Sequence, residues 1–242
     1  MPSVFSALHW LVWRNPTRRA QNLLRFAEIE ADGGRDLVRA AEVTPDPVLR
    51  KLFLKHALDE QRHADLFRGR GLQLIRSLRA DAASAVKADW MAPGERGLDD
   101  LHVEAEGDEA LLAFLHLSEK SAAKDFANYV AVLGADPPTK AVFEKVLHDE
   151  TFHMTYTRAQ LMRVAPKRAT RRIWMARLRR FWKAYLRLAS ALAGLIGAVV
   201  LTAQYLIVLP LFALAAKGAA KREGEGWSPI APARNGALDR QY

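Results

Sequence analysis

The amino-acid sequence repeats itself at an offset of 90 residues, and both copies carry the same pair of chemically distinctive positions. FLKHALDEQRH (residues 53–63) and FEKVLHDETFH (residues 143–153) share the pattern F-x-K-x-x-x-D-E-x-x-H. In each copy a glutamate and a histidine stand three residues apart, which places them on the same side of a helix. A chain that contains two such copies is predicted to fold as two similar halves. The two pairs are Glu60/His63 and Glu150/His153.

The segments around these copies predict a chain of helices. Apolar residues recur at helical spacing in four stretches, and no stretch alternates as a strand does. TPDP (44–47) and GADPP (134–138) supply short turns within each pair of helices, and a longer connection, about 81–104, joins the pairs. The expected fold class is therefore all-α, a four-helix bundle made of two helical hairpins. The four expected helices cover residues 18–43, 46–80, 105–133 and 138–164.

Acidic and histidine side chains interrupt the apolar stripe of each expected helix. The stripe of the second helix, for example, runs from Phe53 to Phe67 through a glutamate and a histidine. Four unpaired carboxylates inside a bundle would cost a great deal of free energy, and metal coordination is the usual remedy. Small residues (Ala27, Gly33 and Gly34) beside the first-helix glutamate would leave room for a metal or a substrate. The candidate ligands are Glu30, Glu60, His63, Glu119, Glu150 and His153.

The order Glu30 … Glu60-x-x-His63 … Glu119 … Glu150-x-x-His153 resembles the ferritin-like di-iron carboxylate superfamily over about residues 18–164. The resemblance implies a ferritin-like bundle with two iron ions, manganese or a mixed Mn/Fe pair being an alternative. It implies that Glu60 and Glu150 bridge the ions, that Glu30 and Glu119 are terminal ligands, and that His63 and His153 supply one imidazole each. These six residues would then form both the metal site and the catalytic centre. DEQRH (59–63) is also similar to the D-E-x-R-H box of di-iron monooxygenases, which implies that Asp59 and Asp149 orient the histidines.

Several assignments have alternatives. Glu28 stands two residues before Glu30 and is an alternative first-helix ligand. Asp59 and Asp149 are equally typical of solvated positions on a helix, and Tyr156 is explained as well by packing as by a hydrogen bond near the site. A degenerate repeat that binds no metal is a further alternative. Three histidines are interpreted as ordinary helix residues: His56, His116 and His148.

The C-terminal part of the chain is strongly basic. Residues 1–150 hold 20 Lys/Arg and 24 Asp/Glu, whereas residues 151–242 hold 16 Lys/Arg and three acids. Such an asymmetry suggests a nucleic acid or an anionic membrane surface as the partner. The basic stretch 171–187 runs directly into 188–216, which are 29 residues without a charge. As a helix these would exceed a hydrocarbon core of ~30 Å, so a membrane partner and no nucleic acid is predicted.

The membrane segment is interpreted as one tilted span or a re-entrant hairpin, with Pro210 ending or kinking the helix. A long buried helix of a soluble bundle is the alternative. Cations before the segment predict that the head lies on the cytoplasmic side of the inner or plasma membrane, with residues 158–187 facing anionic lipid. The expected parts are an interfacial or bundle-packed N-terminal helix, the di-iron bundle, a basic juxtamembrane helix, the transmembrane segment and a flexible tail. They cover residues 1–17, 18–164, 165–187, 188–216 and 217–242.

The resemblance includes proteins of several activities, and departures from each pattern narrow them. Ferritins usually lack the second histidine, which is His153 here, and rubrerythrins carry an extra glutamate where this chain has Ala122. The chain also has no cysteine, which excludes iron–sulfur clusters and Cys-ligated zinc held by its own residues. The six-ligand set more closely resembles that of the membrane-associated quinone hydroxylases, although the surrounding residues match poorly.

The expected function is a membrane-anchored di-iron oxidase or monooxygenase. It would activate O2 or peroxide to oxidise or hydroxylate a lipophilic substrate, with electrons from an unidentified donor. One alternative is a ferroxidase or other iron-handling protein, ferritin-like or rubrerythrin-like, at the membrane. A second is a non-enzymatic interaction module that metal stabilises. A homo-oligomer is compatible with all three.

Overall fold

The computed structural model describes residues 4–86 and 103–222, and every regular element in these ranges is a helix. The prediction of an all-helical chain is confirmed for this part of the protein. Most of the predicted connection 81–104 and most of the predicted tail 217–242 lie outside the described residues. The helices are α1 (Val4–Arg14), α2 (Pro16–Val43), α3 (Pro47–Ser77), α4 (Ala80–Ser84), α5 (Val103–Val132), α6 (Pro137–Val164), α7 (Ala169–Ala203), the π-helical turn η1 (Gln204–Val208) and α8 (Leu209–Ala220).

Three of the long helices begin with the same signal, an Asn or Asp followed by proline. Asn15, Asp46 and Asp136 cap α2, α3 and α6, and each side chain accepts a hydrogen bond from a backbone N–H of the first turn. The proline that follows each cap lacks an N–H and has a φ suited to the first helical position. α5 has no such start. Its chain bends at Gly107, whose φ of 69° favours glycine because it has no Cβ.

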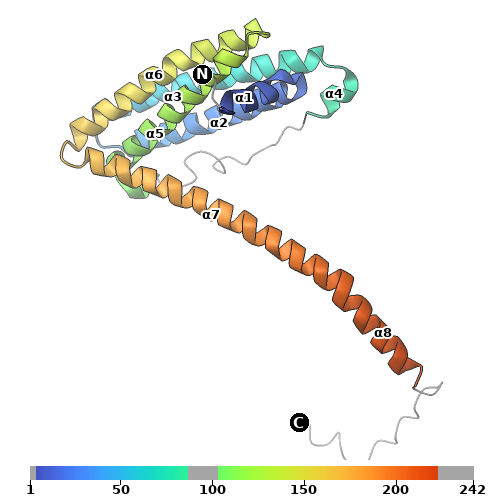
Figure 1. Ribbon diagram of the computed structural model, residues 1–242. Helices are drawn as coiled ribbons and strands as arrows, with labels where there is room; N and C mark the ends of the chain where they lie inside the picture. The colour runs from blue at the N-terminus through green and yellow to red at the C-terminus, as the bar shows by residue number, and fades with distance from the viewer. Residues whose placement is uncertain (1–3, 87–102, 223–242) are drawn as a thin grey trace, which may run out of the picture. The chain divides into compact units, whose positions relative to one another are not determined.

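The four long helices form two antiparallel hairpins. α2 packs along α3 and α5 packs along α6, and α3 and α6 lie against each other between the hairpins (Figure 1). Two apolar clusters of buried residues occupy the two ends of this core. One contains Leu37, Phe53, Leu115 and Leu161, and the other contains Ala27, Phe67, Phe126 and Val146.

On every one of the four helices the candidate ligands lie between a residue of one cluster and a residue of the other. On α2, Glu30 lies between Ala27 and Leu37, and on α5, Glu119 lies between Leu115 and Phe126. The helices run in alternating directions, so the ligands meet at one level. The apolar clusters therefore enclose a single polar layer in the middle of the core.

α1 packs against the helices through Trp13, which is 2% exposed. Its ring stacks with Phe26 and also contacts Tyr129 and Phe143. Of the two positions considered for the N-terminal helix, this burial supports packing on the bundle. Trp10 and Leu11 on the same helix remain about half exposed.

The chain divides into two compact units, Met1–Phe181 and Trp182–Tyr242. The first turns of α7 belong to the first unit, where Ala169 is buried and Arg168 and Arg172 both pair with Glu109 (2.5 and 3.0 Å). The basic stretch and the uncharged run after it belong to one continuous helix.

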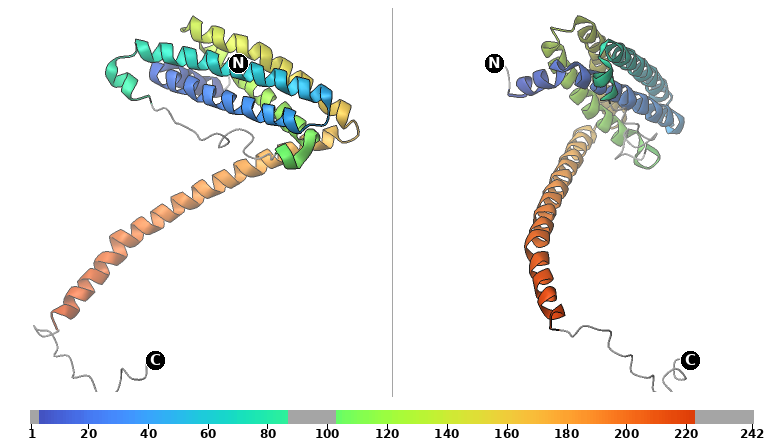
Figure 2. Two further views of the ribbon diagram at one scale, coloured as in Figure 1. Left: turned by 180° about the vertical axis from the view of Figure 1, so that it is seen from behind. Right: turned by 90° about the vertical axis from the view of Figure 1, so that its right-hand side faces the viewer.

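One helix in the described part of the chain, Ala169–Ala220, is long and apolar enough to cross a membrane, and its most apolar window buries no side chain. Figure 2 shows α7, η1 and α8 following one another without a reversal, so the described residues form no re-entrant hairpin. Pro210 does not end the helix. Because proline cannot donate the i→i−4 hydrogen bond, the chain widens into the π-helical turn just before it and then continues to Ala220.

Candidate metal centre

The six candidate ligands come together in the polar layer. All six are buried, with His63 and His153 fully inaccessible and Glu150 1% exposed. Together with His56 they make up two groups of four residues, Glu60 belongs to both groups, and within each group the ligand atoms lie within 4.8 Å of one another. The first group is Glu30, Glu60, His63 and Glu150, and the second is His56, Glu60, Glu119 and His153.

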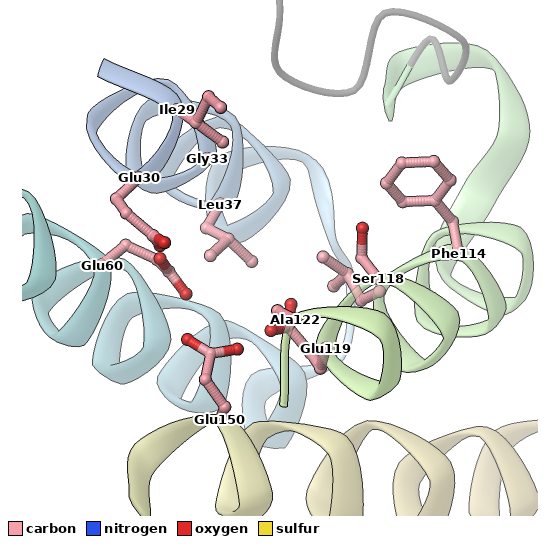
Figure 3. A pocket seen from close by; sticks show the side chains of 11 residues that line it. Ile29, Glu30, Gly33, Leu37, Glu60, Phe114, Ser118, Glu119, Ala122 and Glu150 are labelled. Atoms are coloured by element: carbon pink, nitrogen blue, oxygen red, sulfur yellow. The ribbon is translucent and has the colours of Figure 1, made fainter. Parts of the chain in front are cut away.

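In the first group, Nδ1 of His63 faces three carboxylates. It lies 3.5 Å from Oε1 of Glu150, 3.7 Å from Oε2 of Glu60 and 3.9 Å from Oε2 of Glu30. These distances are too long for hydrogen bonds but suit atoms arranged around a cation. Figure 3 shows the side chains of the three glutamates pointing toward one another from α2, α3 and α6.

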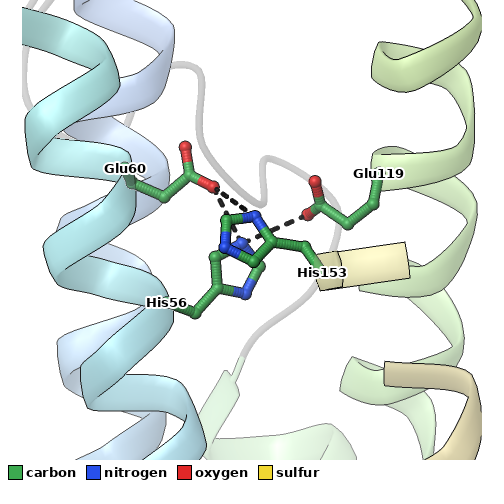
Figure 4. Close-up of side chains that lie close together, drawn as sticks. All are labelled: His56, Glu60, Glu119 and His153. Carbon is green, nitrogen blue, oxygen red and sulfur yellow. Dashed lines mark hydrogen bonds and ion pairs between the residues drawn. The ribbon is translucent and has the colours of Figure 1, made fainter. Parts of the chain in front are cut away.

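In the second group, Nδ1 of His153 lies 3.6 Å from Oε1 of Glu60 (Figure 4). His56 is also present, with Nε2 2.8 Å from Oε1 of Glu60 and 3.6 Å from Oε1 of Glu119. The rings of His56 and His153 are in contact, with centroids 3.6 Å apart. Each group thus holds the shared Glu60 and one histidine of the repeat. The first group also holds Glu30 of the first hairpin, and the second also holds Glu119 of the second hairpin.

The outer nitrogen of each repeat histidine is held by the aspartate of the opposite repeat. His63 donates from Nε2 to Asp149 (3.1 Å), and His153 donates from Nε2 to Asp59 (3.3 Å). Arg62 donates to both aspartates, at 2.8 and 2.7 Å. This crossed network fixes both rings with Nδ1 turned inward, which is how outer groups orient metal-binding histidines. Asp59 and Asp149 are therefore not simply solvated acids.

Three buried side-chain atoms in the described residues have no hydrogen-bond partner, and all three belong to candidate ligands. They are Nδ1 of His63, Nδ1 of His153 and Oε2 of Glu150. A buried polar atom without a partner costs about 1–3 kcal/mol, so three together in one layer require an explanation. Imidazole nitrogen and carboxylate oxygen are ligands that iron, manganese and zinc accept. The residues present therefore fit bound metal ions, whose identity and number the donor set alone does not fix.

The pKa shifts of the side chains in the polar layer indicate that a positive charge among the carboxylates would be stabilised. Burial raises the pKa of Glu30 and of Glu150 well above its usual range, and neighbouring carboxylates raise it further. Burial opposes a positive charge on His63, but Glu30 and Glu60 outweigh it and raise its pKa to about 10. Burial lowers the pKa of His153, and the cations around it lower it further. Without a metal, a proton on His63 supplies the missing cation.

The geometry distinguishes between the alternatives considered from the sequence. Glu30 lies in the polar layer, whereas Glu28 is half exposed and pairs with Arg68 at 3.3 Å. His116 is buried away from the layer and donates from Nδ1 to the carbonyl of Met154, and His148 is exposed.

The structure places two further residues, His56 and Tyr156, at or beside the site. His56 was interpreted as an ordinary helix residue, yet it is 1% exposed and lies inside the second group. Its signal was its position on the apolar stripe, one turn before Glu60. Tyr156 donates a hydrogen bond of 2.7 Å to Nδ1 of His56, so the tyrosine does belong to the site's surroundings.

A cavity of about 150 Å³ opens on the carboxylate side of the layer (Figure 3). Four glutamates form its inner wall, and its outer wall is mostly apolar. Gly33 contributes open space, because a Cβ at this position would meet no atom within 4 Å. The cavity reaches the surface at Ile29, whose side chain is 42% exposed. The remaining lining residues are Leu37, Phe114, Leu115, Ser118 and Ala122.

The comparisons with known proteins identify no relative: no family model, no curated protein and no solved structure matches this chain.

Proposed function

We propose that this protein is a membrane-anchored di-iron oxidoreductase of the ferritin-like type, which oxidises or hydroxylates a lipophilic substrate with O2 or peroxide. The observation that supports this most directly is the arrangement of the polar layer. Two groups of nitrogen and oxygen donors share one carboxylate, and three of their buried atoms have no hydrogen-bond partner among the described residues. Paired metal ions bridged by a carboxylate match such a set.

The residues for the two ions follow from the two groups. Glu30 and His63 would hold one ion, Glu119 and His153 the other, and Glu60 would be shared. We propose Glu150 as the second shared ligand, because its pKa responds to Glu119 as well as to Glu60 and Glu30. Bound iron supplies the redox chemistry, in which two electrons from a donor and two protons reduce one oxygen atom of O2 to water while the other enters the substrate.

The protein's own side chains determine on which side a substrate arrives. On the histidine side, Asp59, Asp149 and Arg62 close the layer with direct hydrogen bonds. On the carboxylate side, the cavity offers about 150 Å³ beside Glu30 and Glu119. The mostly apolar outer wall of this cavity suits a hydrocarbon group, which would displace water from the carboxylate side when it binds. We therefore assign the cavity to the substrate.

The helix Ala169–Ala220 would anchor the protein in a membrane, where lipophilic substrates concentrate. Seven Lys/Arg in residues 171–187 precede the uncharged run, and three follow within residues 217–222. By the positive-inside tendency we propose that the helical head lies on the cytoplasmic side. Anionic lipid would then contact the basic stretch.

The proposal is tested on the full chain purified in a neutral detergent and loaded with Fe(II) under anaerobic conditions. Metal content is measured by mass spectrometry, and O2 consumption is then followed with a chemical reductant, with and without a lipid extract from the source cells. The extract is examined for molecules that gain one oxygen atom or lose two hydrogens. Glu150→Ala/His153→Ala is the variant, and Glu144→Gln, an exposed residue of α6, is the control.

Two irons per chain and lipid-dependent O2 consumption, both lost in the variant and kept in the control, would support the proposal. Fe(II) oxidation that ignores lipid and yields a multi-iron product would assign the chain to iron handling instead. Stable metal binding with neither reaction would indicate an interaction module. Protein that takes up no metal would overturn all three.

A further inference from the structure

A second polar site lies between α5, α6 and the first turns of α7, and none of its residues belongs to the two groups of candidate metal ligands. Two adjoining cavities of about 450 and 290 Å³ share three lining residues, His116, Lys120 and Arg158. The second cavity adds Arg177 and Trp174 from α7. We call the site formed by His116, Lys120, Arg158 and Arg177 the basic pocket. All of it belongs to the compact unit Met1–Phe181.

Among the residues that the structure describes, the cations of the basic pocket have no acidic partner. No Asp or Glu lines either cavity, and Lys120, Arg158 and Arg177 form no ion pair with any described residue. At the start of α7, by contrast, the nearby cations Arg168 and Arg172 both pair with Glu109. Three cations that converge from three helices without a counter-charge repel one another, and a bound anion would relieve this repulsion.

His116 reports how closely these charges converge. Its ring is buried, and Nδ1 is fixed by a hydrogen bond of 3.1 Å to the carbonyl of Met154. Burial lowers the pKa of His116, and the charges of Arg158, Lys120 and Arg177 lower it further. The charged form of the imidazole is therefore disfavoured, and the positive charge offered to a ligand comes from Lys120, Arg158 and Arg177.

Apart from Thr155, Thr170 and His116, the walls of the basic pocket are apolar where they are not cationic. Met154 and Met162 line one cavity, and Ile173 and Trp174 line the other, with Trp174 64% exposed. A site for a small inorganic ion does not need such walls. Trp174 and Arg177 also lie in the basic stretch 171–187 that leads directly into the uncharged run. Tryptophan among cations at this position is typical of the headgroup level of a membrane.

We propose that the basic pocket binds the phosphate group of an anionic ligand. Lys120, Arg158 and Arg177 would donate to the phosphate oxygens, and Trp174 and the methionines would contact the adjoining organic part. Arginine and lysine both bind phosphate through charge-assisted hydrogen bonds. A phospholipid headgroup and a free phosphate share this chemistry. The site does not depend on the metal centre.

The test uses the full chain in a neutral maltoside detergent and counts bound ligand by native mass spectrometry. The probes are dihexanoyl phosphatidic acid and dihexanoyl phosphatidylcholine, a zwitterion with the same chains, and inorganic phosphate is the competitor. The variant is Lys120→Gln/Arg158→Gln. The matched control, Lys124→Gln/Lys145→Gln, removes the same charge from exposed positions of the same two helices.

We expect one phosphatidic acid per chain, bound more tightly than phosphatidylcholine. The pocket variant should weaken this binding at least tenfold, because each charge-assisted hydrogen bond contributes about a tenfold factor or more. The control should bind as the wild type does. Because both substituted residues of the pocket variant are exposed, its helix content and its metal content should be unchanged, which separates this result from a failure of the metal site.

The other outcomes are equally informative. Displacement of the lipid by an equal concentration of inorganic phosphate would retain the phosphate site but assign it to a soluble ligand. Equal weakening in the pocket variant and the control would show attraction by overall charge only, and would overturn the proposal. Unchanged binding in the pocket variant and in Arg177→Gln would overturn it as well.

Discussion

Glu150→Gln separates the metal-binding role of the polar layer from a structural role, because the two roles predict opposite effects on stability. Glu150 is 1% exposed, and its Oε2 has no hydrogen-bond partner. Burial raises its pKa well above the usual range, and the charges of Glu119, Glu60 and Glu30 raise it further. In the metal-free protein the surroundings therefore disfavour the charged form of this side chain, and glutamine matches the uncharged form in shape and charge.

The expected magnitudes follow from this comparison. The free energy of unfolding of the metal-free variant should equal or exceed that of the wild type, within about 1 kcal/mol, because an uncharged amide replaces an acid whose charged form is disfavoured. For the wild type, metal at a thousand times its dissociation constant adds about 4 kcal/mol. In a domain of this size that corresponds to a rise in melting temperature of about 8–16 °C. In Glu150→Gln this rise should fall to less than half.

The assay is thermal unfolding of the full chain in neutral detergent, followed by circular dichroism after chelation and again after Fe(II) is added anaerobically. Glu144→Gln is the control, since Glu144 is half exposed on the same helix and pairs only with Lys140. Exposed pairs contribute little, so this variant should show the full metal-dependent rise. A metal-free Glu150→Gln that is destabilised by several kcal/mol would refute the reasoning, as would a full rise with metal.

The other predictions concern the surroundings of the site. Asp149→Asn should weaken metal binding about 10–100-fold, measured by competition with a chelator, because it removes the charge that orients His63. Gly33→Ala should narrow the cavity without loss of stability. Gly34→Ala should lower the melting temperature, because its Cβ would lie 3.3 Å from the carbonyl oxygen of Ala57. Equal melting temperatures of the two variants would contradict this. Asp136→Asn should keep the helix cap but cost about 3 kcal/mol at neutral pH. Burial opposes the charge of Asp136, but Thr139 and two arginines outweigh it and lower its pKa. Its contribution is thus complete above pH ~4 and is lost as the pH falls through the lowered pKa, so the melting temperatures of variant and wild type should converge in acid.

The sequence predicted the parts of the site that follow from helical phase. Glu60 and His63 lie on one stripe of one helix, so their meeting inside the core needs only the 3.6-residue period and an apolar stripe around them. The repeat extended the same argument to the second hairpin. The choice between Glu30 and Glu28 depended on which side of their helix faces the core, and this helix has few large apolar residues to mark that side. In the structure, burial of Glu30 distinguishes the two.

The parts that the sequence did not predict depend on contacts between hairpins. His153 donates a hydrogen bond to Asp59 of the other repeat, and His63 donates one to Asp149. These hydrogen bonds follow from how α3 lies against α6, which no local sequence pattern encodes. The same holds for Arg62, which donates to both aspartates. Its counterpart in the second repeat is Phe152, so the second hairpin supplies no equivalent donor. The repeat suggested symmetric halves, whereas this bridge makes them unequal.

His56 illustrates how hydrogen bonds assign a role that proximity alone leaves open. It lies among the ligands, but its two ring nitrogens are both occupied. Glu60 is a carboxylate that can only accept, so Nε2 of His56 carries the proton that it donates at 2.8 Å, and Nδ1 accepts from the hydroxyl of Tyr156. Burial lowers the pKa of His56, which keeps the ring neutral in this tautomer.

A metal on Nε2 of His56 would displace that proton and leave Glu60 without its hydrogen bond. The inward nitrogens of His63 and His153, by contrast, have no partner to lose. Coordination therefore breaks no hydrogen bond at the two repeat histidines, although at His63 it displaces a proton, whereas it breaks an existing hydrogen bond at His56. The hydrogen bonds from Tyr156 to His56 and from His56 to Glu60 fix the carboxylate common to both groups, just as Asp149 and Asp59 fix the histidines, and six residues remain as the proposed ligand set.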